Sequence, residues 1–356
     1  CDSLICLANH HVSNHACVPC EVGYERAAGD LADGDDTECT KVLPTASISV
    51  GGSSATGDVE PNTQGLYETE VNGDPGVDVD GFNVVATAYG TLVHNDVRQV
   101  SWVADSRSGR TARLHAAASD EFLNKPHMQP ARVAYMYTLN SVRGQGAVVG
   151  VGNSECEVSS SKTKETYLEP VQDRYSFDTT SLDGELPVIL MNSRSTNDEG
   201  VFTCNVYGAN AQSGQFKVSV GRSDKREGWN DASLKVAYVA LTKNAPEVTK
   251  DVLAAGEIKV PPPESDVFQT YSSIKLEHNL NTTNYQCLAT VRVDSNVKPD
   301  RQFIVECQGG TPNTITLTVA DHERRSWTDW RDNDNVYVMY ALIPNRGSTP
   351  LISVSE

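Results

Sequence analysis

The nine cysteines are the residues whose type and spacing could do the most chemistry in this chain. Five lie within the first 39 residues, and the other four are spread over the rest of the sequence. They are Cys1, Cys6, Cys17, Cys20 and Cys39, followed by Cys156, Cys204, Cys287 and Cys307. Such density in a segment too short to bury an apolar core predicts disulfides formed in an oxidising compartment. Because nine is odd, one thiol lacks a partner within the chain, and Cys1 is the candidate.

The same segment also has the ligand types of a zinc site. Cys17 and Cys20 have the spacing of a zinc-binding pair, and Cys6 lies nearby in the sequence. Three neighbouring histidines could add ligands: His10, His11 and His15. A structural zinc ribbon needs a second close pair of cysteines, which this segment lacks. The spacing therefore favours disulfides over zinc, and it leaves the connectivity open.

Two acidic stretches could bind calcium through carboxylate oxygens. The candidate ligands are Asp30, Asp33, Asp35 and Asp36 in the first stretch, and Asp74, Asp78 and Asp80 in the second. Neither stretch has the spacing or the terminal Glu of an EF-hand loop. A solvated turn rich in Asp and Gly is the favoured interpretation. We therefore expect no cofactor, with calcium as the one candidate.

Signals for catalysis, nucleic-acid binding and membrane spanning are missing from the sequence. It has no His-Glu-x-x-His pair, Gly-x-Ser-x-Gly elbow, Walker loop or dinucleotide-binding loop. The 29 basic and 47 acidic residues give a net charge of −18 without a basic stripe, which argues against nucleic acid as a partner. No apolar run has the length of a membrane helix. We expect a protein that is not an enzyme.

One sequon for N-linked glycosylation is present at Asn281-Thr282-Thr283. It precedes an expected strand and lies in a polar run, so we expect an exposed loop that carries glycan in a secreted protein. The chain begins at Cys1 without an initiator Met or a signal-peptide pattern, and we expect a processed form or a fragment.

The elements that position these residues are predicted to be strands. Residues 215–220 and 314–319 alternate polar and apolar side chains, and turn-forming residues punctuate the chain throughout. A similar strand-like segment recurs about every 100 residues, at 133–139, 236–241 and 336–342. A period of this length matches one β-sandwich domain. The expected fold class is all-β, with tandem β-sandwich domains after a small disulfide-rich module.

Residues 1–40 resemble a known class of extracellular modules. The segment 9–20 reads NHHVSNHACVPC, and it is followed by Gly23, AAGD at 27–30 and GDDTEC at 34–39. These motifs resemble the cysteine-rich repeats of the ephrin-receptor-like and tumour-necrosis-factor-receptor-like type, and more closely a version found in secreted proteins of algae and other aquatic protists. The resemblance implies a module of large extracellular proteins. It also implies the disulfide pairs Cys6–Cys17 and Cys20–Cys39.

The segment around Cys204 resembles the immunoglobulin family. Residues 198–204 read DEGVFTC, which is similar to the D-x-G-x-[Tyr/Phe]-x-C pattern of strand F. The resemblance implies an immunoglobulin-like sandwich in which Phe202 and Cys204 face the core, and a disulfide between Cys156 and Cys204. The chain departs from the family because no Trp lies between these cysteines and Phe202 lacks the hydroxyl of a tyrosine corner.

Cys287 and Cys307 are separated by 20 residues. This spacing suits neighbouring strands of a hairpin that turns at 294–300, and we expect a disulfide between them. The predicted domains are a cysteine module at 1–40, a first sandwich at 41–145, an immunoglobulin-like second sandwich at 146–258 and a third sandwich at 259–356. The run Pro261-Pro262-Pro263 is expected to be a stiff spacer between the last two.

The expected function is that of an extracellular or cell-surface structural glycoprotein. Tandem sandwiches would form a rod, and rods that join head to tail without closing build a filament. The resemblance of the module implies flagellar hairs (mastigonemes) or similar glycoprotein fibrils. The apolar segments 336–342 and 351–356 could pair with the edge of a neighbouring subunit. The expected partners are further copies of the chain and attached glycans; the alternative is a receptor-like or adhesive ectodomain that binds a protein or a glycan.

Overall fold

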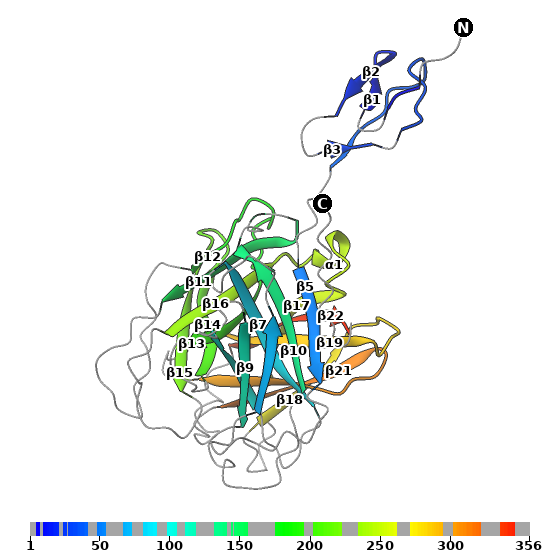
Figure 1. The fold of residues 1–356 in the computed structure, drawn as a ribbon. Coiled ribbons are helices and arrows are strands. Elements are labelled where there is room, and N and C mark those ends of the chain that lie inside the picture. Colours follow the sequence, from blue (N-terminus) through cyan, green and yellow to red (C-terminus); the bar gives the residue numbers. More distant parts are fainter. Residues whose placement is uncertain are drawn as a thin grey trace. The chain divides into compact units, whose positions relative to one another are not determined.

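The chain folds into two compact units, residues 1–46 and 47–356, in a computed structural model (Figure 1). The structure describes residues 5–7, 10–20, 24–26, 28–41, 48–54, 67–72, 81–90, 98–104, 111–118, 132–140, 144, 146–155, 175–195, 202–222, 234–261, 271–294, 302–321 and 335–345. These residues form strands almost throughout, so the all-β prediction is confirmed. The one helix among them is the single turn α1 (Ala245–Val248).

The N-terminal unit is a small cross-linked module. Strand β1 (His10–Ser13) pairs antiparallel with β2 (Ala16–Pro19), and β3 (Tyr24–Glu25) pairs with β4 (Thr40–Lys41). The turn residues Asn14 and His15 both have positive φ, at 51° and 59°, as a tight hairpin turn of the primed type requires. The module contains the disulfides Cys6–Cys17 and Cys20–Cys39, which are the pairs that the family resemblance implies. Its last strand extends past the predicted boundary at residue 40.

The larger unit contains three six-stranded sheets. In spatial order, the first sheet consists of β18 (Tyr271–Glu277), β21 (Thr314–Asp321), β20 (Phe303–Gln308), β7 (Phe82–Gly90), β10 (Arg132–Leu139) and β5 (Ile48–Ser54). The second consists of β11 (Val148–Glu155), β16 (Leu234–Leu241), β13 (Val188–Ser195), β8 (Arg98–Ala104), β9 (Thr111–Ala118) and β6 (Tyr67–Asn72). The third consists of β12 (Tyr175–Ser176), β15 (Gln215–Arg222), β14 (Phe202–Asn210), β19 (Tyr285–Val293), β22 (Val336–Pro344) and β17 (Ala254–Lys259).

The three sheets reveal a pseudo-threefold arrangement of three sequence copies. Copy one comprises β5–β10, copy two β11–β16 and copy three β17–β22. In each copy the first, sixth and third strands form half of one sheet, and the second, fifth and fourth strands form half of another. Each sheet therefore joins halves of two different copies through one parallel pair, namely β20–β7, β13–β8 or β14–β19. All other strand pairs in these sheets are antiparallel.

This arrangement changes the predicted domain organisation. The copies share sheets and form one compact unit, whereas the sequence indicated three separate sandwiches joined by spacers. Copy three begins with β17, before residue 259, so Pro261 follows its first strand and does not divide it from copy two. Within each copy the second, fifth and fourth strands lie side by side, as strands B, E and D do in an immunoglobulin sandwich. The sixth and third strands pair in the same way as strands F and C. The first strand pairs with the sixth, where the immunoglobulin family has a seventh.

Three further strand assignments differ from the sequence prediction. Phe202 and Cys204 are both buried in β14 as expected, but β14 is the fourth strand of its copy and takes the place of strand D, not F. Strands β19 and β20 do not form a hairpin, because the connection between them carries the chain from the third sheet to the first. Strand β22, which includes 336–342, is paired on both sides, by β19 and β17, and offers no edge for strand addition.

Candidate functional site

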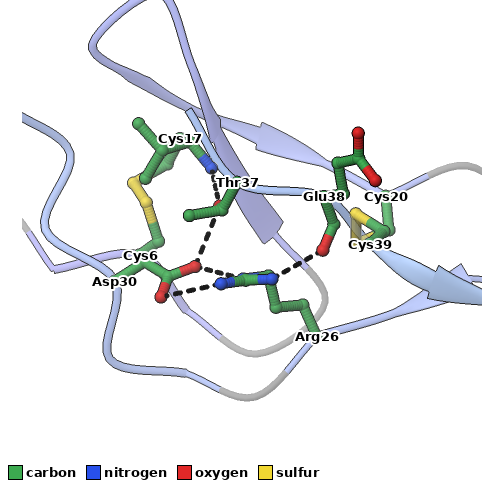
Figure 2. Close-up of polar contacts among 9 residues, drawn as sticks. Cys6, Cys17, Cys20, Arg26, Asp30, Thr37, Glu38 and Cys39 are labelled. Atoms are coloured by element: carbon green, nitrogen blue, oxygen red, sulfur yellow. Dashed lines mark hydrogen bonds and ion pairs between the residues drawn. A yellow bond between two sulfur atoms is a disulfide. The ribbon is translucent and has the colours of Figure 1, made fainter. Parts of the chain in front are cut away.

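The module is stabilised by a polar network around Arg26. This guanidinium forms an ion pair with Asp30 and donates to the main-chain oxygen of Glu38 over 2.6 Å (Figure 2). The hydroxyl of Thr37 donates to the Asp30 carboxylate over 3.0 Å and accepts from the amide of Val12 over 2.9 Å. The hydrogen bond from Arg26 holds the pKa of Asp30 below its ordinary value. This network supplements a small buried cluster that, among the described residues of the module, consists of Cys6, Val12 and Ala32 with Cys17 packed against it.

Most candidate ligands of the alternative zinc and calcium sites already have other partners in the module. Cys6, Cys17 and Cys20 are in disulfides, so their thiolates are not available to zinc. Asp30 is paired with Arg26, and the Asp36 carboxylate accepts from the amide of Asn14 over 2.8 Å. In the part of the chain that the structure describes, no three His, Cys, Asp or Glu side chains gather as a metal site. The second calcium stretch, Asp74, Asp78 and Asp80, lies outside that part.

One face of the module is apolar and exposed. Ile5 and Leu31 form an antiparallel bridge, which places their side chains on the same face. Leu7 lies two residues after Ile5 and is likewise exposed, while Cys6 between them is buried. The side chains of Ile5, Leu7 and Leu31 are 58%, 71% and 49% exposed. We call these three residues the apolar face of the module.

The sequon lies on a firmly held loop between β18 and β19. Asn281 is exposed and has a φ of 55°, and its amide donates to the Asn313 side chain over 2.9 Å. The amide of His278 donates to the main-chain oxygen of Asn313, also over 2.9 Å. The hydroxyl of Tyr285, next to this loop, shares its proton between the main-chain oxygens of Thr311 and Thr314, at 2.9 and 3.0 Å. The backbone of the sequon is thus fixed while the Asn281 side chain is accessible, as a glycan site requires.

Copies one, two and three meet where their third strands, β7, β13 and β19, approach one another. Each of these strands contributes one buried polar side chain that accepts from an amide of the next: Asn192 from Ala86 over 2.6 Å, Thr290 from Met191 over 3.0 Å, and Thr87 from Ala289 over 2.8 Å. The three acceptors are equivalent under the pseudo-threefold arrangement, since each lies two residues before the parallel junction of its strand. We call Thr87, Asn192 and Thr290 the polar ring.

The polar ring compensates for missing strand pairing. On the edge that forms the parallel pair, pairing of the third strands begins only at Tyr89, Arg194 and Arg292. The amides three residues earlier, those of Ala86, Met191 and Ala289, therefore have no neighbouring strand on that edge. Side-chain oxygens accept from these amides instead, and all three acceptors are less than 5% exposed. A cavity lined by ring residues has room for about one water molecule. Sequence reasoning missed the ring, although the polar residues interrupt otherwise apolar strands.

The three described cysteines of the larger unit are buried. Cys204 is 6% exposed next to the ring, and its predicted partner Cys156 lies outside the described residues. Cys287 and Cys307 are thiols in the structure, so the disulfide predicted between them is not formed there. Both nevertheless belong to the buried core cluster of copy three.

Comparison with known proteins identifies no relative of this chain. The chain matches no protein-family model, no curated protein and no solved structure. Among the described residues, no helix is long and apolar enough to cross a membrane.

Proposed function

We propose that the protein is an extracellular structural glycoprotein, a non-catalytic subunit of a filament or other surface assembly. Two disulfides in the module and an accessible sequon in copy three support secretion through an oxidising, glycosylating compartment. The polar side chains that converge within the larger unit accept from main-chain amides, so they serve stability. This pattern supports a structural role over a catalytic one.

The apolar face of the module carries the proposal of assembly. The described part of the module has three buried residues in its core cluster and exposes the large aliphatic side chains of Ile5, Leu7 and Leu31. Full burial of such a side chain contributes roughly 1.5–3 kcal/mol to the free energy of association. Because the three side chains are only 49–71% exposed, covering all of them would contribute roughly 3–6 kcal/mol. Contiguous exposed apolar surface is typical of protein contact sites. The occupant we propose is a neighbouring copy of the chain. The apolar face replaces segment 336–342 as the expected contact, and the other segment expected to pair, 351–356, lies outside the described residues.

Electron microscopy and analytical ultracentrifugation of the native glycoprotein test this function. We expect filaments or higher oligomers whose association weakens by about tenfold for each apolar residue replaced, since 1.4 kcal/mol corresponds to that factor. The variants are Ile5→Ser, Leu7→Ser and Leu31→Ser, and the control is Asp35→Ser, an exposed residue of the same module. A monodisperse monomer at high concentration would count against assembly. If that monomer bound another protein or a glycan through this face, the receptor-like alternative would replace it.

A further inference from the structure

Cys287 and Cys307 both lie in the buried core cluster of copy three. Cys287 lies on β19 of the third sheet and Cys307 on β20 of the first, and both are fully buried. The Sγ–H of Cys307 donates to the main-chain oxygen of Cys287 over 3.4 Å. The thiol of Cys287 donates to the main-chain oxygen of Leu288 over 3.7 Å. The contact of Cys307 with Cys287 therefore joins two different sheets.

Copy two shows what this position holds without cysteines. The parallel junctions place Val206 opposite Arg292, and Cys307 opposite Tyr89, so Val206 and Cys307 are equivalent. By the same register Ile189 is equivalent to Cys287. Ile189 and Val206 are both fully buried, so the position tolerates an ordinary aliphatic pair. Copy three alone has two thiols at these positions, with the Cys307 sulfur 3.4 Å from the Cys287 main-chain oxygen, where packing does not demand them.

We propose that Cys287 and Cys307 are the site of a third structural disulfide, which cross-links the two sheets of copy three and forms before the core closes. The oxidant is a disulfide-bearing thiol carrier of the secretory compartment, the class of reagent that forms the module's two disulfides. One cysteine thiolate attacks the carrier disulfide and releases a carrier thiolate. The second cysteine thiolate then attacks the mixed disulfide, forms the Cys287–Cys307 bond and releases the second carrier thiol. Two thiols lose two electrons and two protons, and the carrier disulfide gains them.

The order of events follows from burial. Exchange needs a thiolate and an approach path for the carrier. Desolvation raises the pKa of Cys307 well above its ordinary value, and the neighbouring Cys287 raises it further. In the folded, reduced protein Cys307 is therefore held as the thiol, and both cysteines are inaccessible. The bond must form on the incompletely folded chain, and once the core closes the same burial protects it from reduction.

Peptide mapping of the full chain secreted from eukaryotic cells tests the inference. After denaturation and alkylation without reductant, we expect a cross-linked peptide pair containing Cys287 and Cys307, lighter by two hydrogens than the two free peptides. Recovery of both cysteines in alkylated form would overturn the proposal. The double variant Cys287→Ile, Cys307→Val copies the pair of copy two, and it should lose this cross-link while it keeps Cys6–Cys17 and Cys20–Cys39.

A second measurement tests the order of events. Protein refolded under reducing conditions is transferred to oxidised glutathione, either folded or in urea, and the cross-linked peptide is quantified over time. We expect oxidation in urea and at least a tenfold slower reaction in the folded state. Equal rates in both states would overturn the claim that the bond precedes closure of the core.

Discussion

Replacement of Thr290 by Val tests whether the polar ring holds the three copies together. Valine keeps the shape of threonine but removes the oxygen that accepts from the Met191 amide at 3.0 Å. That amide would remain buried without a partner, which costs about 1–3 kcal/mol. Thr87→Val should cost more, about 2–4 kcal/mol, because this hydroxyl also donates to the Ala289 carbonyl at 3.2 Å. Thr290→Ser keeps the acceptor and should recover most of the loss.

Urea unfolding followed by intrinsic fluorescence and circular dichroism measures these effects. Since every sheet contains strands of two copies, we expect one transition for residues 47–356, whose midpoint falls in both variants. The control Thr316→Val lies on β21 with a partly exposed side chain and should change stability by less than about 0.5 kcal/mol. The reasoning is refuted if the ring variants cost no more than this control, or if Thr290→Val shifts a transition of copy three while the rest unfolds independently.

Three further predictions concern copy three. Gly310→Ala should destabilise it measurably in urea, because the added Cβ would lie 2.0 Å from the Tyr285 hydroxyl; an unchanged midpoint would contradict this packing. Glu257→Gln should cost about 1–3 kcal/mol, because it weakens the paired hydrogen bonds of 2.7 and 3.0 Å to the buried Arg292, and a neutral result would show that Asp294 compensates fully. Desolvation lowers the pKa of His278 below 6.5, so its neutral form stabilises the fold fully above pH 6.5, and that contribution is lost as the pH falls below this value. The melting temperature of His278→Gln should therefore fall less than that of the wild type between pH 7 and 5, and parallel curves would exclude this role.

Local patterns predicted the strands well, because strands such as β18 alternate between buried and exposed residues and central strands such as β16 are short apolar runs. Strand β18 shows the alternation directly, since Ser272, Ile274 and Leu276 are buried while Ser273 and Lys275 are exposed. The module disulfides were also accessible to sequence reasoning, since their motifs lie within one short segment. In both cases the deciding interactions connect residues near one another in the chain.

The sharing of sheets between copies could not be read from local patterns. The pair between Tyr89 and Cys307 joins copies one and three across most of the chain, and no turn sequence encodes it. The spacing of Cys287 and Cys307 likewise fits a hairpin as well as a crossover between sheets, and only the packing of the whole unit decides between them. Thr87 and Thr290 looked like ordinary strand residues, because their importance depends on which edge they face.

The ring and the shared sheets together restrict where assembly can occur. A linear array of sandwiches has two terminal domains, and either could offer an edge to a neighbour. Here Thr87 of copy one bonds to Ala289 of copy three, so the first and last copies are joined directly. The strand that looked most suited to addition, β22, lies inside a sheet between β19 and β17. Because the three copies close on one another, β22 is paired within the unit and is not offered to a partner. We therefore expect the contact with a neighbouring copy at the apolar face, which consists of Ile5, Leu7 and Leu31.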